Sequence, residues 1–182
     1  MGRTDSPNSK EHKSKGKLRV SYEDTHISVV RACSKVLKDG YEPDILIGIS
    51  TGGLIVMRIA KACFEEELER KLRAYVIGIS YYDENNQRLK EPLITQKLDS
   101  DLEGKIAGTK VLLLDEIDDS RRTLETASKY ILGLGASELR ILVAYLKKSP
   151  KTGVLPEGVK VYYGRIIPNC WIEYPWESKR LY

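Results

Sequence analysis

The sequence predicts an α/β domain whose central, mostly parallel sheet is flanked by helices and carries a small C-terminal hood. Three observations support this fold class. Short runs of bulky apolar residues, such as 45–49 and 111–114, are typical of buried parallel strands. Segments with apolar residues at helical spacing alternate with those runs. The length of 182 residues, with 41% hydrophobic and 31% charged residues, is typical of one soluble domain.

The first 17 residues, rich in Ser, Gly, Pro and Asn, predict a disordered basic tail, so the folded domain is expected over residues 18–182. Five basic and two acidic residues give this tail a formal charge of +3, which leaves +1 of the total of +4 for the rest. Nucleic-acid binding by the domain is therefore not expected, because phosphate contacts need clustered Lys and Arg. The tail lacks the apolar segment of a secretory signal and the length of a membrane span. We expect its removal to leave the function of the domain unchanged.

Cysteines and histidines exclude several kinds of site. Cys33, Cys63 and Cys170 lie far apart, and an odd count argues against a complete disulfide framework, so a reducing, cytoplasmic setting is predicted. The two histidines, His12 in the tail and His26 near the first expected helix, do not make a convincing zinc site or Ser-His-Asp triad. We interpret His26 as structural.

The chain continues with a helix, a strand and a second helix. Apolar residues recur at helical spacing over 22–37, and Gly40 marks the end of that helix. The buried strand 45–49 follows, and another helix is expected from Leu54 to about Arg70. Between that strand and that helix lies a turn whose paired glycines let the backbone approach phosphate oxygens. This turn consists of Ser50, Thr51, Gly52 and Gly53.

A third strand is expected at residues 74–80. Residues 81–104 after it are polar and charged, with few periodic apolar positions. A loop of this length in a compact domain is usually functional, so we predict a flexible lid. A long solvated hairpin is the alternative.

The most informative stretch reads VLLLDEIDDSRRT and spans residues 111–123. Parallel strands carry ligands at their carboxyl ends, and acidic residues are expected just past the end of strand 111–114. The adjacent carboxylates of Asp115 and Glu116 suit two neighbouring sugar hydroxyls and can help to hold Mg²⁺. Residues 120–123 offer hydroxyls and the N-terminus of the next helix, an anion site suited to a monophosphate. A ribose 5-phosphate would satisfy both halves; an ordinary acidic helix cap is the alternative.

The last expected elements are a strand at 138–146 and a hood at about 164–182. Lys147 and Lys148 directly follow that strand. In the hood, Trp171 and Trp176 lie within six residues of each other, with Pro168 before the first and Pro175 directly before the second, which favours an exposed aromatic surface for a ligand. A pair of core tryptophans is the alternative.

Taken together, these motifs resemble those of type I phosphoribosyltransferases. Residues 111–123 are similar to the family's motif for phosphoribosyl diphosphate (PRPP), except that Arg121 replaces a glycine, the residue that adopts φ > 0 at least cost. Residues 49–60 resemble the diphosphate loop of bacterial xanthine-guanine enzymes, with Thr51 in place of a basic residue. The resemblance implies a non-proline cis peptide at Ser50–Thr51. Residues 79–93 resemble the flexible loop of those enzymes, and residues 168–177 resemble their Trp-containing hood. The DEIDD sequence at 115–119 is also similar to yeast-type hypoxanthine-guanine enzymes.

The resemblance covers the chain from about residue 20 to its end and implies the type I phosphoribosyltransferase fold. It implies a purine salvage enzyme that transfers ribose 5-phosphate from PRPP to a 6-oxopurine (xanthine, guanine or hypoxanthine) and releases diphosphate. Mg²⁺ is the implied cofactor, PRPP and a purine base are the implied partners, and a homodimer or homotetramer is the usual assembly of the family.

Roles for individual residues follow from the same resemblance. Asp119 is expected to act as the catalytic base or charge stabiliser at N7 of the purine, and Lys147 to donate to the 6-oxo group. Asp115 and Glu116 are expected at the ribose and Mg²⁺, with Glu177 as a further metal contact. The other expected groups are a 5-phosphate loop (Asp119, Ser120, Arg121, Arg122, Thr123), a diphosphate loop (Ser50, Thr51, Gly52, Gly53), lid residues (Ser80, Tyr81) and purine contacts (Trp171, Ile172).

A regulatory protein on the same fold, which binds PRPP or a nucleotide without turnover, is the alternative function. The near-neutral charge outside the tail disfavours one that acts on RNA. Asp119 and the hood with Trp171 favour catalysis. An enzyme for adenine or orotate is disfavoured because Lys147 and the hood sequence WIEYPWE indicate an oxopurine.

Overall fold

The computed structural model describes residues 13–14, 16–83, 85 and 87–177 of the chain. A six-stranded sheet forms its centre, in the order β5-β4-β3-β6-β7-β8, and all neighbours are parallel except β4 and β5. Its strands are β3 (Ile45–Ser50), β4 (Arg73–Tyr82), β5 (Arg88–Gln96), β6 (Lys110–Asp118), β7 (Glu138–Lys147) and β8 (Lys160–Ile167). A smaller sheet, in the order β1-β2-β9, consists of β1 (Lys13–Ser14), β2 (Lys17–Arg19) and β9 (Trp171–Glu173).

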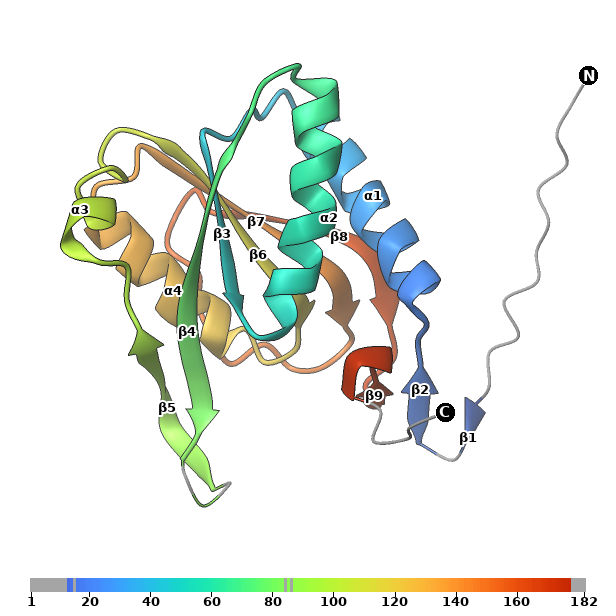
Figure 1. Cartoon of the computed structure of the whole chain (residues 1–182). Helices are drawn as coiled ribbons and strands as arrows, with labels where there is room; N and C mark the ends of the chain where they lie inside the picture. The colour runs from blue at the N-terminus through green and yellow to red at the C-terminus, as the bar shows by residue number, and fades with distance from the viewer. Residues whose placement is uncertain (1–12, 15, 84, 86, 178–182) are drawn as a thin grey trace, which may run out of the picture.

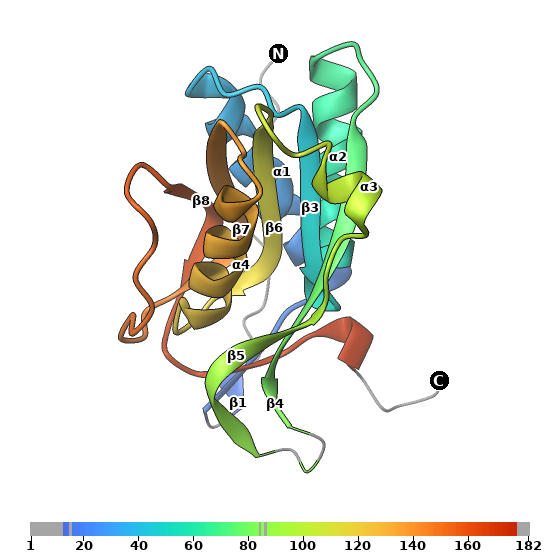
Figure 2. The same cartoon turned by 90° about the vertical axis from the view of Figure 1, so that its left-hand side faces the viewer.

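Helices cover both faces of the central sheet (Figures 1 and 2). The helices are α1 (Tyr22–Lys38), α2 (Gly52–Glu67), α3 (Ser100–Glu103) and α4 (Arg122–Gly133), and a 3₁₀ helix spans Pro175–Glu177. Alternate strand residues point to opposite faces. Leu112 and Leu114 therefore pack in one core with α1 and α2, whereas Val111 and Leu113 pack in another with α4. This arrangement confirms the predicted fold class.

Local sequence signals explain where the helices begin. Ser21 caps α1 in a reciprocal capping box with Asp24, which satisfies backbone groups at the helix start. Helix α2 begins at Gly52, two residues earlier than the expected Leu54, so the paired glycines form its first turn. A Cβ atom on Gly53 would lie 2.5 Å from the carbonyl oxygen of Leu114, so only glycine lets α2 approach β6 this closely. The paired-glycine turn is therefore continuous with a helix N-terminus.

Three boundaries expected from the sequence were wrong. Strand β6 runs to Asp118, so Asp115 and Glu116 lie within the strand rather than past its end. The region 81–104 contains all of β5 and all of α3, and β4 and β5 form a long hairpin that projects beyond the carboxyl ends of the other strands (Figure 2). Strand β8 was not expected at all, and it takes residues 164–167 from the predicted hood.

The N-terminal boundary also differs from the expectation. Residues 13–14 and 17–19 form β1 and β2, and β2 pairs in parallel with β9 of the hood. The other expected tail positions, 1–12 and 15, and the end of the expected hood, 178–182, lie outside the described residues. In the part of the chain that is described, none of the helices has the length and apolar character needed to cross a membrane.

Candidate active site

A cavity of about 570 Å³ opens at the carboxyl ends of β3, β4 and β6. The parallel strands end on the same side of the sheet, so the loops that follow them converge there. Sequence-predicted residues that line the cavity are Ser50, Thr51, Gly52, Ser80, Tyr81, Asp115, Glu116, Asp119, Ser120, Arg121 and Thr123. Predicted residues outside its lining are Gly53, Arg122, Lys147, Trp171, Ile172 and Glu177.

The two adjacent carboxylates of β6 lie close to the start of α2. Asp115 is only 8% exposed, and burial together with the neighbouring charge of Glu116 raises the pKa of Asp115 well above its ordinary value. The Oε2 atom of Glu116 is buried and has no hydrogen-bond partner among the described residues. A Cβ atom on Gly52 would collide with this carboxylate, so the glycine makes room for it. The pair thus places two carboxyl groups side by side, with unused acceptor capacity at Glu116.

The turn between β3 and α2 has the expected backbone form. The peptide bond between Ser50 and Thr51 is cis, which confirms that expectation. Both residues line the cavity beside Gly52, the first residue of α2. The turn therefore directs a helix N-terminus, which favours anions, at the cavity.

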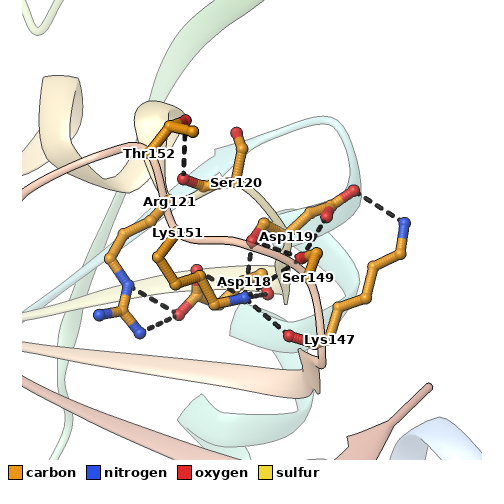
Figure 3. Close-up of polar contacts among 8 residues, drawn as sticks. All are labelled: Asp118, Asp119, Ser120, Arg121, Lys147, Ser149, Lys151 and Thr152. Carbon is orange, nitrogen blue, oxygen red and sulfur yellow. Dashed lines mark hydrogen bonds and ion pairs between the residues drawn. The ribbon is translucent and has the colours of Figure 1, made fainter. Parts of the chain in front are cut away.

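The loop after β6 takes the shape that a glycine usually provides. Arg121 has a φ of +70°, in the left-handed region. Its Nε and Nη2 atoms donate to Oδ2 of Asp118, at 3.0 and 2.7 Å, and Asp118 is fully buried (Figure 3). The backbone N–H groups of Thr152 and Gly153 both donate to the carbonyl oxygen of Ser120, at 3.0 Å. The loop is thus held by the carboxylate of Asp118 and by the backbone of residues 152–153.

Asp119 and Lys147 lie at the ends of neighbouring strands and form an ion pair. The Nζ atom of Lys147 donates to Oδ2 of Asp119 at 2.9 Å, and the hydroxyl of Ser149 donates to Oδ1 at 2.7 Å (Figure 3). Partial burial acts to raise the pKa of Asp119, but the hydrogen bonds from Lys147 and Ser149 outweigh it and hold the pKa below its ordinary value. Asp119 is therefore ionised at neutral pH and able to accept a hydrogen bond or a proton.

Comparison with known proteins identifies the family. Residues 21–175 match the family model of the phosphoribosyl transferase domain. The chain belongs to the phosphoribosyltransferase family. It is 30% identical to the hypoxanthine-guanine phosphoribosyltransferase of Schizosaccharomyces pombe over 186 residues, which cover 90% of each chain. It is 27% identical to xanthine phosphoribosyltransferase 1 of Saccharomyces cerevisiae, again over 90% of each chain.

Solved structures of similar shape support the type I phosphoribosyltransferase fold. A hypothetical protein from Neisseria gonorrhoeae, crystallised with bound ppGpp, is 31% identical and gives a TM-score of 0.79 over 92% of this chain and 93% of that one. A purine phosphoribosyltransferase from Pyrococcus horikoshii gives a TM-score of 0.65 at 23% identity, over 92% and 98% of the two chains, which is a likeness of fold alone.

The hairpin that occupies the expected lid region of this phosphoribosyltransferase contacts the start of α4. Arg122, the first residue of α4, donates to Oε1 of Glu91 on β5 at 2.6 Å. A hydrogen bond with Tyr81 on β4 is the main cause that raises the pKa of Arg122. Arg122 therefore holds the hairpin, whereas Ser80 and Tyr81 face the cavity. The motion expected of a lid stays a prediction.

The hood is joined to the rest of the domain through β2 and through aromatic contacts. Trp171 is 64% exposed, whereas Ile172 is buried beside Leu18 of β2. Trp176 stacks on Tyr174 with ring centroids 4.6 Å apart. Burial and the charge of Glu116 raise the pKa of Glu177, so the hood carboxyl group lies within electrostatic reach of Glu116. The two tryptophans thus have different environments.

Sequence reasoning missed several residues that shape the site. It assigned no role to Asp118, Ser149, Lys151 or Thr152, which link the loops after β6 and β7. Within the residues that the structure describes, no cluster of three or more His, Cys, Asp or Glu side chains could by itself hold a metal ion.

Proposed function

We propose that this chain is a purine phosphoribosyltransferase that transfers ribose 5-phosphate from PRPP to N9 of a 6-oxopurine and releases diphosphate. The ion pair between Asp119 and Lys147 carries this proposal. A 6-oxopurine presents N7 and O6 next to each other on one edge. An ionised carboxylate can accept from N7–H while the neighbouring ammonium, which has only donors, donates to O6. The relatives named hypoxanthine-guanine and xanthine phosphoribosyltransferase support an oxopurine as the substrate.

The parts of the cavity match the parts of PRPP. The carboxylates of Asp115 and Glu116 would accept from the ribose hydroxyls. Ser120 and Thr123, at the start of α4, would hold the 5-phosphate, and the turn at Ser50–Gly53 would face the diphosphate. As N9 attacks C1 of the ribose, the bond from C1 to the diphosphate breaks and the purine loses its N7 proton towards Asp119. Carboxylates near C1 favour the positive charge that develops there.

The acidic pair also fits a Mg²⁺ ion. Carboxylate oxygens are the ligands that Mg²⁺ prefers, and Oε2 of Glu116 is buried without a hydrogen-bond partner in the described part of the chain. Asp115 and Glu116 would hold the ion, with Glu177 of the hood near it. When bound, Mg²⁺ would neutralise charge on the diphosphate leaving group. Because no larger ligand cluster occurs among the described residues, we expect the ion to bind together with PRPP.

A second candidate function is the sensing of a nucleotide without turnover. The specific observation in its favour is the ppGpp bound to the similar protein from Neisseria gonorrhoeae. This nucleotide combines a guanine base, a ribose and diphosphate groups, the same chemical parts that we assign to the cavity. Binding alone therefore does not distinguish a sensor from an enzyme.

Turnover separates the two functions. The purified protein is incubated with PRPP and Mg²⁺ and offered hypoxanthine, guanine, xanthine, adenine or orotate separately, while diphosphate release is followed. We expect turnover with one or more oxopurines and none with adenine or orotate. Silence with all five bases, together with measurable binding of PRPP or ppGpp, would instead support the nucleotide sensor.

A further inference from the structure

Lys151 lies in the loop after β7, and its ammonium group is directed back at the ends of two strands (Figure 3). Its Nζ atom donates to the carbonyl oxygens of Asp118 at 2.8 Å, Asp119 at 2.6 Å and Lys147 at 2.8 Å. It also lies 3.5 Å from the hydroxyl oxygen of Ser149. The side chain is only 21% exposed. One partly buried cation thus contacts the backbone of both loops.

The position of these carbonyl groups explains why a lysine suits this place. Asp118 and Lys147 are the last residues of β6 and β7, and the pairing of β6 with β7 ends at Asp118 opposite Leu146. The carbonyl groups of Asp118, Asp119 and Lys147 therefore need hydrogen-bond donors from elsewhere, because a buried acceptor without a partner costs free energy. An ammonium group has three donors and no acceptor, so it can satisfy three converging carbonyl oxygens at once. The Nζ atom of Lys151 also lies 3.8 Å from Oδ1 of the buried carboxylate of Asp118.

Two of the three carbonyl groups belong to the residues that we assign to the purine. Holding the backbone of Asp119 and of Lys147 restrains the separation of their side chains. The residues directly after Lys151 are Thr152 and Gly153, whose N–H groups bind the carbonyl oxygen of Ser120. The loop segment that contains Lys151 therefore contacts the backbone of both purine-assigned residues and also holds the loop after β6.

We propose that Lys151 is a positioning residue that holds Asp119 and Lys147 in register for the purine, an inference that rests on the proposed function. All three short hydrogen bonds of Lys151 go to backbone carbonyl oxygens, so its effect passes through the two backbone segments that it joins. A small displacement of catalytic groups is enough to lower turnover strongly.

Three variants test this role. Lys151→Met keeps the length of the side chain and removes its donors, whereas Lys151→Arg restores several donors. Lys148→Met is the matched control, because Lys148 is an exposed neighbour whose side chain we assign to no part of the site. We expect Lys151→Met to lower kcat/KM for the purine by about 10- to 100-fold, with a smaller effect on the KM for PRPP. Lys151→Arg should recover part of the loss, and Lys148→Met should behave as the wild type.

Hydrogen exchange gives a readout that does not depend on turnover. Lys151→Met should speed amide exchange in peptides covering residues 118–123 and 148–153, and Lys148→Met should not. Wild-type kinetics in Lys151→Met would overturn the inference, even with faster exchange, since Lys151 would then be only structural. Unchanged exchange in both peptides would overturn it as well.

The same variants distinguish failure of this inference from failure of the proposed function. If the wild-type protein binds GMP but has no turnover, the proposed function fails, and the dissociation constant for GMP replaces kcat/KM as the readout. Weaker GMP binding in Lys151→Met than in Lys148→Met would then support the positioning role, and equal binding would refute it. If Lys151→Met does not fold, Lys151→Arg is compared with Lys148→Met in the same assays, and a smaller but specific loss is expected.

Discussion

Arg121 adopts a left-handed backbone conformation and donates two hydrogen bonds to the fully buried carboxylate of Asp118. A non-glycine residue in this conformation costs about 1 kcal/mol. Removing one partner of a buried ion pair costs about 3 kcal/mol, so the pair outweighs the backbone cost. This relationship explains how the phosphate loop tolerates arginine in place of the glycine that the family usually has.

The first prediction ranks two variants of this loop by stability. Arg121→Gly relieves the backbone cost but loses the ion pair, so the free energy of unfolding should fall by about 2 kcal/mol. Arg121→Ala also loses the ion pair but keeps the backbone cost, so its free energy of unfolding should be about 1 kcal/mol lower than that of Arg121→Gly. Urea denaturation measures both. An Arg121→Gly variant more stable than the wild type would show that the ion pair contributes little.

The second prediction concerns Asp119, whose carboxylate we place at N7 of the purine. Asp119→Asn keeps the shape of the side chain and removes its charge, so kcat should fall by about 100-fold or more while PRPP binding stays largely intact. Steady-state kinetics and calorimetric titration with PRPP measure the two effects. Asp101→Asn, an exposed change on α3, is the control and should have no effect. Unchanged turnover in Asp119→Asn would remove this residue from the mechanism.

The third prediction uses the different environments of the two tryptophans. Trp171 is mostly exposed, so Trp171→Ala should change the free energy of unfolding by less than about 0.5 kcal/mol. It should weaken purine binding by about 1 to 3 kcal/mol if the ring stacks on the base. Trp176→Ala should instead destabilise the fold by about 3 kcal/mol, because its ring stacks on Tyr174. Unaltered purine affinity in Trp171→Ala would place the base elsewhere.

The fourth prediction replaces the expectation that residues 1–17 can be removed without effect. Lys17 and Arg19 of β2 form ion pairs with Glu173 of β9, at 2.9 and 2.6 Å, so this short strand supports the hood. Removal of residues 1–12 should leave kinetics unchanged. Removal of residues 1–19 should raise the KM for the purine by about 3- to 10-fold, with little change in the KM for PRPP. Equal kinetics for the two truncated chains would show that the hood does not depend on β2.

Much of the architecture could be predicted because it depends on local patterns. The apolar runs at 45–49 and 111–114 identified central strands, since only a buried strand uses several bulky residues in succession. Strand β8 was missed because its sequence KVYYGRII mixes polar residues and a glycine, and because its partner β7 supplies the pairing that stabilises it. Strand β5 was placed in a flexible lid, with a long solvated hairpin as the alternative, because its sequence RLKEPLITQ follows no periodic apolar pattern.

The sequence by itself determined the fold class and predicted the acidic pair, the paired-glycine turn and a phosphate loop, because each depends on short contiguous motifs. Only the tertiary structure decided which distant groups meet. The contacts of Lys151 with Asp118 and Asp119 span 33 and 32 residues, and that of Arg19 with Glu173 spans 154. No local pattern records such contacts, because strand order and register, and not sequence spacing, decide which side chains share the carboxyl edge of a sheet.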